Sequence, residues 1–366
     1  MAIRLVKRVS PDVRGFLDEA LSLAMAFQGM PEGLAGLERA ADAGRAIGNS
    51  VVELESLLAL TSFLAAQGER PRVQRLVQWL DRRVPADARM GFLLDLAHAS
   101  TALHDCDFAT ARSRLAIHLA RPSCEFAVAT NAGLVALYTE DAALARRAVA
   151  GGESNVVFGA FASSMAWLRA IVPLIEGDLD AATRCLESEG SAPTIATAAF
   201  PLRCMAAEIA LAHGGWRRAA ALLDEIEPGI ATTFFHHYAA TVHLLRAHVA
   251  RAAAQPREAE TRTHRALELA AEHELQVVAT DALETLAVLA ADVDEIANAG
   301  RLLGAADGFR ERTGYRWIHP HRRADLDAIR ERIDPAHRAE GAALSLAEAI
   351  AWARRGRGER RPTVST

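Results

Sequence analysis

Histidine is the residue type in this sequence whose spacing most invites a search for metal chemistry. The chain has 13 histidines. The pairs His236/His243 and His237/His248 are 7 and 11 positions apart, so each pair shares one face of a helix. A compact zinc site needs closer pairs and a third ligand, and the sequence offers neither. We therefore expect no metal and no cofactor, and histidines that pack among helices.

Aromatic side chains gather at one point of a chain that has few of them. Only 20 residues are Phe, Tyr or Trp, and three of these fall in the segment Phe234 to Tyr238. Packing in the core is the preferred interpretation. The alternative is an aromatic anchor for a ligand. The candidate contacts for that ligand are Phe234, Phe235, His236, His237, Tyr238 and His243.

Other reactive residues do not form a recognisable catalytic set. His319 and His321 flank Pro320 before a predicted helix, which they could cap. The sequence has no phosphate-binding loop, and its only lysine, Lys7, has no glycine-rich surroundings. No CxxC pair occurs, so we expect buried thiols at Cys106, Cys124, Cys185 and Cys204. We predict a protein that is not an enzyme.

Composition sets the class of the protein. Hydrophobic residues make up 51% and charged residues 24%, which is enough to bury a core. The net charge of -5 gives the chain no basic surface for nonspecific nucleic-acid binding. We find no signal peptide and no membrane-spanning segment, and expect a cytoplasmic protein.

Helical periodicity and regularly spaced turns organise the chain. Apolar residues recur at i, i+3, i+4 and i+7, as in amphipathic helices. Eight turns lead into helix starts, with a small or aliphatic residue just inside each helix. Successive spacings of these residues are 39, 38, 34, 37, 37, 40 and 38 for Leu34, Val73, Ala111, Ala145, Ala182, Ala219, Ala259 and Ala297. The pattern predicts an all-α solenoid of about eight helical hairpins.

The turn residues explain how the chain reverses. A left-handed residue at a helix end favours glycine, which predicts that conformation at Gly29, Gly68, Gly177 and Gly214. Proline fits the first helical turn, which predicts that position for Pro31, Pro71 and Pro256. Aspartate caps exposed N–H groups, which predicts caps at Asp107, Asp178 and Asp292.

The turns resemble those of the tetratricopeptide repeat family in degenerate form. The similarity is clearest from Gly177 to Ala182, from Gly214 to Ala219 and from Ala266 to Leu269. This resemblance covers roughly residues 11–305. It implies TPR-like helix pairs with an extended concave surface that binds a protein or small effector.

The C-terminal part resembles the end of the helical-repeat region in large actinobacterial LuxR-type regulators. Its motifs are an R-L-L-G-A-A stretch from Arg301 to Ala306 and an A-L-S-L-x-E-A stretch from Ala343 to Ala349. Ser345 and Glu348 form a predicted capping box, and Asp334 before Pro335 a predicted N-cap. The ATPase motif is missing, and the sequence stops at Thr366, where such regulators continue into a helix-turn-helix.

These patterns divide the chain into an N-terminal tail at 1–10, a TPR-like solenoid at 11–306, capping helices at 307–353 and a basic linker at 354–366. The resemblance implies a sensor and protein-interaction region for signal transduction in transcription regulation. DNA would be reached only through a module absent from this sequence, and a homo-oligomer is allowed. The alternative function is a stand-alone scaffold that bridges other proteins.

Overall fold

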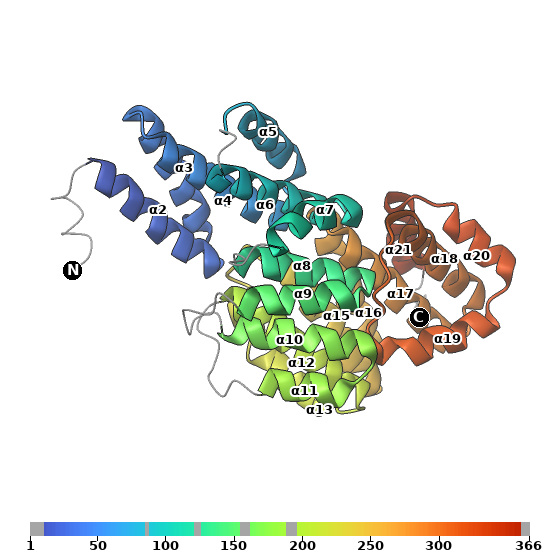
Figure 1. Ribbon diagram of the computed structural model, residues 1–366. Helices are drawn as coiled ribbons and strands as arrows, with labels where there is room; N and C mark the ends of the chain where they lie inside the picture. The colour runs from blue at the N-terminus through green and yellow to red at the C-terminus, as the bar shows by residue number, and fades with distance from the viewer. Residues whose placement is uncertain (1–10, 85–87, 121–125, 154–161, 188–195, 360–366) are drawn as a thin grey trace. The chain divides into compact units, whose positions relative to one another are not determined.

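The protein is all α-helical in a computed structural model, which describes residues 11–84, 88–120, 126–153, 162–187 and 196–359 (Figure 1). These residues contain no strand, so the predicted fold class is confirmed. The first helices are α2 (Pro11–Phe27), α3 (Pro31–Ala46), α4 (Ser50–Gln67), α5 (Arg70–Asp81), α6 (Ala88–His104), α7 (Phe108–Leu119), α8 (Phe126–Thr139), α9 (Ala142–Glu153), α10 (Ala162–Glu176) and α11 (Leu179–Glu187). The remaining helices are α12 (Ala196–Ala212), α13 (Trp216–Asp224), α14 (Glu227–Ile230), α15 (His236–Ala252), α16 (Pro256–Glu272), α17 (Gln276–Asp292), α18 (Ile296–Thr313), the 3-10 helix η2 (Pro320–Arg322), α19 (Arg323–Arg332), α20 (Pro335–Ala342) and α21 (Leu346–Glu359).

Each of the eight predicted turns contains one residue in the left-handed backbone conformation. The four predicted glycines have φ between 73° and 82°. The other four turns use residues with a Cβ, at φ between 53° and 63°, namely Cys106, Glu140, Ala254 and Asp294. Non-glycine residues adopt this region at a steric cost. The turn geometry is therefore set by the surrounding helices and not by glycine alone.

Most predicted caps are present. Pro31, Pro71 and Pro256 occupy the first turns of α3, α5 and α16. Asp107 accepts a hydrogen bond from the Thr110 N–H at 3.0 Å, and Asp178 accepts one from the Ala181 N–H at 2.8 Å. The prediction for Asp292 is wrong, because this residue ends α17 and binds the guanidinium of Arg251.

Six of the eight repeat positions are buried, as expected of residues where two helices cross. Leu34 is only half-buried, and the closest approach to the α2 backbone is made by Gly33, where a Cβ would lie 2.4 Å from the Ala26 nitrogen. Ala297 is also half-buried. The equivalent position in α18 is Ala299, which is fully buried, so the predicted register was two residues early there.

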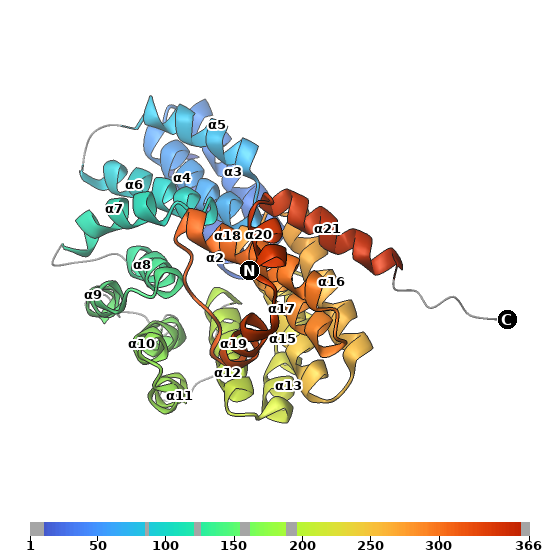
Figure 2. The ribbon, with the colours of Figure 1, turned by 90° about the vertical axis from the view of Figure 1, so that its right-hand side faces the viewer.

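The chain divides into two compact units. The first contains residues up to 137, 141–202 and 229–235, and the second contains 138–140, 203–228 and residues from 236 onward. In the first unit, contacts link α2 to α3, α3 to α4 and α4 to α6, and also α9 to α10 and α10 to α11. Figure 2 looks nearly along α9, α10 and α11, which follow one another side by side. Serial contact of this kind is what stacked hairpins produce.

One first-unit helix, α4, has the length and mean hydropathy of 1.2 that a membrane span requires. It passes that test by length and composition only, and 56% of its apolar window is buried within the structure. It contacts α3, α5 and α6. Helices in a protein core pass the same test, so we interpret α4 as the central helix of the first unit.

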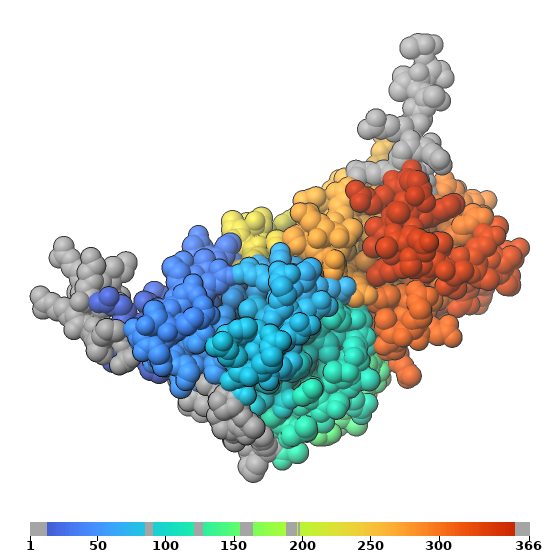
Figure 3. Space-filling model, turned by 90° about the horizontal axis from the view of Figure 1, so that it is seen from above, coloured from blue at the N-terminus to red at the C-terminus, as the bar shows by residue number. Residues whose placement is uncertain are grey.

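In the second unit, α17 is the central helix and contacts α15, α16, α18, α19 and α21. Its buried residues run continuously from Val277 to Ala291. A helix that is buried on all sides lies in the middle of a core. The last helices, coloured red, form part of the surface seen in Figure 3. The predicted divisions at 306/307 and 353/354 fall inside α18 and α21.

A glycine face joins α18 to α20. Gly300, Gly304 and Gly308 are four residues apart, so they share one side of α18. A Cβ on Gly304 would lie 2.0 Å from the Arg338 carbonyl oxygen, and one on Gly341 would lie 2.0 Å from the Arg301 carbonyl oxygen. The two backbones therefore touch with no room for a side chain.

The predicted caps near the C-terminus are confirmed. Asp334 accepts a hydrogen bond from the Ala336 N–H at 2.8 Å. Glu348 accepts the Ser345 N–H at 2.8 Å, while the Ser345 hydroxyl accepts the Glu348 N–H at 3.2 Å. We expect Ser345→Ala to lower the free energy of unfolding by about 1 kcal/mol. Urea denaturation would measure this, and Glu348→Gln should cost less, because glutamine also completes a capping box.

Candidate functional site

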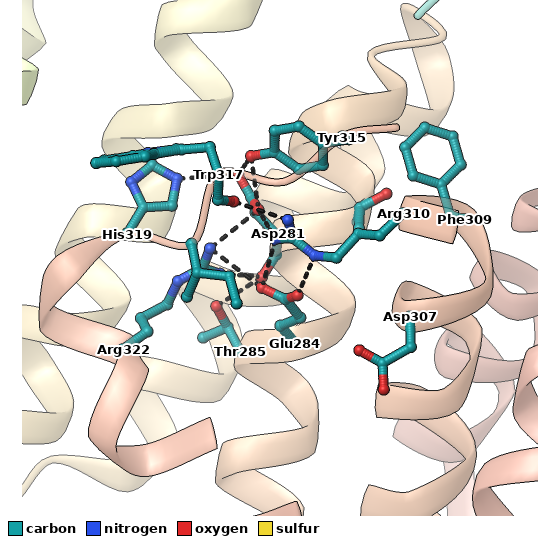
Figure 4. A network of polar contacts seen from close by, with 12 residues as sticks. Asp281, Glu284, Thr285, Asp307, Phe309, Arg310, Tyr315, Trp317, His319 and Arg322 are labelled. Carbon is teal, nitrogen blue, oxygen red and sulfur yellow. Dashed lines mark hydrogen bonds and ion pairs between the residues drawn. The ribbon is translucent and has the colours of Figure 1, made fainter. Parts of the chain in front are cut away.

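A network of charged side chains is buried in the second unit (Figure 4). Two acids at its centre, Asp281 and Glu284, lie three residues apart on α17, so they share one side of that helix. Asp281 is 4% exposed and Glu284 is fully buried. Buried carboxylates are destabilising unless cations and hydrogen bonds surround them, and three elements supply such partners.

Asp281 binds four side chains. Its carboxylate accepts hydrogen bonds from Tyr315 Oη at 3.2 Å, from His319 Nε2 at 3.0 Å and from Arg322 Nη2 at 2.9 Å. Arg310 Nη2 approaches to 3.4 Å. Burial alone would raise the pKa of Asp281, but Arg322, His319 and Arg310 hold it well below its usual value. The carboxylate therefore stays ionised and serves as the common anchor.

Glu284 is held by two arginines. Arg310 donates to both of its carboxylate oxygens, from Nε at 2.6 Å and from Nη2 at 3.1 Å. Arg322 Nη2 lies 3.2 Å from the same carboxylate. Paired donors of this kind fix geometry as well as charge. The two arginines thus bridge both acids, and Arg322 is itself 1% exposed.

His319 is the third cation of the network. Its Nδ1 lies 2.9 Å from a carboxylate oxygen of Glu208, as an ion pair without hydrogen-bond geometry. Burial would lower the pKa of His319, but the carboxylates of Glu208 and Asp281 outweigh burial and raise it to about 9. The ring is therefore charged at neutral pH.

The segment Gly314 to Arg322, which we call the strap, carries most of these groups to α17. Its backbone N–H groups at Arg316 and Trp317 donate to the Tyr138 carbonyl oxygen at 2.7 and 3.2 Å. The Trp317 carbonyl accepts from Arg310 Nη1 at 2.8 Å. Tyr315 and Trp317 are each 1% exposed. Backbone and side-chain contacts together dock the strap, although it has no helix before Pro320.

Three further histidines border the network in uncharged form. Burial lowers the pKa of His237 to about 4, and it holds the pKa values of His248 and His321 well below the usual value. The Thr285 hydroxyl donates to the Asp281 carbonyl at 2.8 Å, so the contact between Thr285 and His248 Nε2 at 3.3 Å makes the ring the donor. His248 is thus held as one neutral tautomer.

The six predicted contact residues are divided between the two units. Phe234 and Phe235 are buried in the first unit, where Phe234 packs against Phe63 and Phe235 against Phe200. In the second unit, His237 borders the charged network and Tyr238 is half-buried, and desolvation raises the pKa of Tyr238. Their role as ligand contacts stays a prediction.

The other two predicted contacts lie away from the network. His236 stacks on His273 with ring centroids 3.6 Å apart. His243 Nδ1 lies 3.4 Å from Arg262 Nη1. Burial lowers the pKa values of His236 and His243. The helix face that His237 and His248 share, as predicted, is the face next to the network. Asp281 and His319 of the network both shift the pKa values of these two rings.

The idea that the His319 segment caps a helix is wrong. His319 precedes η2 but its side chain makes no cap, because Asp281 and Glu208 bind both ring nitrogens. Cys106 and Cys204 are buried thiols as predicted, and burial raises the pKa of Cys106 to about 12. Cys185 is half-buried, and Cys124 lies outside the described residues. In the part of the chain described, no three His, Cys, Asp or Glu side chains are placed to hold a metal ion.

Sequence reasoning missed Asp281, Glu284, Arg310 and Arg322. One signal was present: two acids three residues apart inside an otherwise apolar helix, Gln276–Asp292. A buried acid demands a cation, and basic residues follow in the next two elements. The chemistry of the network is ionic cross-linking, because its charged groups are already paired with one another.

The pKa of His319 is raised, whereas the pKa values of the three uncharged histidines are lowered. Together these shifts predict that the free energy of unfolding is greatest near pH 6.5. Above that pH, the raised pKa of His319 makes stability fall through about pH 9. Below it, His237, His248 and His321 take up protons only on unfolding, so stability falls again. Each group contributes a slope of up to about 1.4 kcal/mol per pH unit. Urea denaturation at pH 5.5, 6.5 and 8.5 measures this, and His319→Gln should flatten only the alkaline side.

Comparison with known proteins places the chain beside transcription regulators. No known family profile matches it. It is 40% identical over 139 residues to proteins of Mycobacterium bovis and of two Mycobacterium tuberculosis strains, whose names describe an HTH-type transcriptional regulator. The matched segment covers 36% of this chain and 15% of each relative. The chain is therefore related in part to much longer proteins named as regulators.

Proposed function

We propose that this chain is the sensor and protein-interaction region of a LuxR-type transcription regulator, and that it works by binding and not by catalysis. The observation that carries the proposal is the 40% identity to proteins named as HTH-type regulators. Each relative is far longer than the matched segment. In this proposal, DNA is read by a helix-turn-helix outside this sequence.

The architecture supports a binding role. Helical hairpins that contact their sequence neighbours cannot bury their apolar faces alone, so they stack and leave a long surface for a partner. An effector or protein bound on the concave side of TPR-like pairs would shift the chain between two conformations, and the DNA-reading module would respond. The charged network is then a structural lock in the second unit.

The test measures transcription directly in the native host. Transcripts are compared between a strain that lacks the gene and the same strain with the complete gene restored under an inducible promoter. A tagged protein is then mapped on the chromosome. A regulator should occupy a small set of promoters whose transcripts change within minutes of induction. A gene with an early frameshift is the control.

The opposite result supports the scaffold alternative. In that case no promoter is occupied, transcripts stay unchanged, and a stable protein partner purifies with the chain in stoichiometric amount. Promoter occupancy without a transcript change would also contradict the proposed role.

A further inference from the structure

The charged groups of the network balance one another without the bordering histidines. Three carboxylates, from Asp281, Glu284 and Glu208, face three cations, from Arg310, Arg322 and His319. Every carboxylate has a cation within 3.0 Å. An added positive charge would therefore find no free carboxylate in the network.

Two uncharged histidines lie directly beside these cations. The His248 and His321 rings are 4.5 Å apart, and His321 is 5.8 Å from the charged ring of His319. His321 belongs to the strap, whereas His248 belongs to α15. Both ring nitrogens of His321 are buried and have no hydrogen-bond partner among the described residues. Among the described residues, the groups that act on the pKa of His321 are His248, His319 and Arg322, and none of these is a carboxylate.

The groups that act most strongly on the charge of these two rings are mostly cations. Arg322, His319 and Arg251 disfavour a charge on His248, and only Asp281 favours it. Arg251 is itself paired with Asp292 and Asp325. The charged and titratable groups around the pair, by element, are Glu208 of α12, His237 and Arg251 of α15, Asp281 and Glu284 of α17, Arg310 of α18, Tyr315, His319 and Arg322 of the strap, and Asp325 of α19.

We propose that His248 and His321 form an acid-sensitive latch, and that their protonation releases the strap from α17. This inference deepens the proposed function, because it names proton concentration as one signal that the sensor region receives. Helix α16 keeps its fold when the latch opens.

Electrostatic repulsion determines whether acid opens or closes the strap. A proton on either ring adds positive charge beside Arg322 and His319, the residues that tie the strap to Asp281. Like charges at close range in a buried site repel strongly. Exposure of the strap to water relieves that repulsion and hydrates the unpartnered nitrogens of His321. Acid therefore favours the open strap, and the contribution of the two neutral rings to the closed strap is complete above about pH 6.5.

The experiment is hydrogen exchange with mass spectrometry on the purified full chain at pH 7.5 and 5.5, with rates corrected for the intrinsic effect of pH. We expect the protection of strap amides at Arg316 and Trp317 to fall at least about tenfold at pH 5.5. Amides of α16 should keep their protection. The double variant His248→Gln/His321→Phe should reduce the fall to less than about threefold.

Two further variants make the result specific. His213→Gln removes an exposed histidine of the same unit and should leave the wild-type response intact. His321→Phe alone keeps the ring contact with His248 but removes the unpartnered nitrogens. We expect this variant to fold, because losing unsatisfied polar atoms is not costly. The fall in strap protection at pH 5.5 should be smaller than in the wild type, so this variant tests the latch even if the double variant does not fold.

Three results would overturn the latch. The first is that strap amides exchange equally at the two pH values. The second is that His321→Phe responds to pH like the wild type. The third is that α16 loses protection together with the strap. The measurement needs no promoter, so the latch can fail while the regulator proposal survives. Conversely, a chain that never touches transcription can still show the latch.

Discussion

Replacement of Arg322 by methionine is expected to lower the free energy of unfolding by about 3–5 kcal/mol. The variant leaves Asp281 and Glu284 in the core with one cation fewer, and it also removes the bond to the Asp281 carbonyl oxygen at 2.9 Å. Methionine fills much of the space of the arginine stem, so the loss reports on charge more than on packing. Urea denaturation at pH 7 measures the change.

Arg323→Met is the matched control. Arg323 is the next residue and pairs with Glu140 at 3.0 Å, but its side chain is 43% exposed. Surface ion pairs contribute about 0–1 kcal/mol, so this variant should be nearly neutral. Adding Glu284→Gln to Arg322→Met should recover part of the loss, because it removes one unbalanced charge. Similar costs for the two arginine variants would contradict the buried-network account.

Gly304→Ala is expected to destabilise the second unit by about 1–3 kcal/mol. The added methyl group would lie 2.0 Å from the Arg338 carbonyl oxygen, and that backbone oxygen cannot move without shifting α20. Alanine is a better helix former than glycine, so a loss of stability at this position reports the close contact between helices. Thermal denaturation gives the size of the change.

The same substitution at Gly91 should act in the opposite direction. Gly91 lies inside α6, and a Cβ there would meet no atom within 4 Å. Gly91→Ala should therefore gain about 0.5–1 kcal/mol from the lower entropy of the unfolded chain. A loss at Gly91 as large as at Gly304 would mean that the crossing of α18 and α20 is not the cause.

Local chemistry made the helices and turns predictable. The backbone at Gly177 or the cap at Asp107 depends on residues within four positions, and the sequence displays all of them. The prediction for Asp292 failed because its carboxylate can either cap a helix or pair with an arginine. Asp292 could cap α18, but Arg251, 41 residues earlier, binds its carboxylate in the folded chain.

The charged network could not be predicted in the same way. Asp281 meets Arg310 and Arg322, which are 29 and 41 residues later, and His319 meets Glu208 across more than a hundred positions. Sequence spacing along one helix identified the face of His237 and His248, but not what that face meets. The cluster at Phe234 and Phe235 was correctly given core packing as its first interpretation.

The order in which a ribosome makes the chain has a consequence for Asp281. This residue emerges before every side chain from Arg310 to Arg322 that neutralises it. Until about forty more residues are added, α17 carries two acids whose main cations do not yet exist. A nascent chain stalled near residue 305 should therefore keep α17 open to proteases, and completion of the strap should close it in one step.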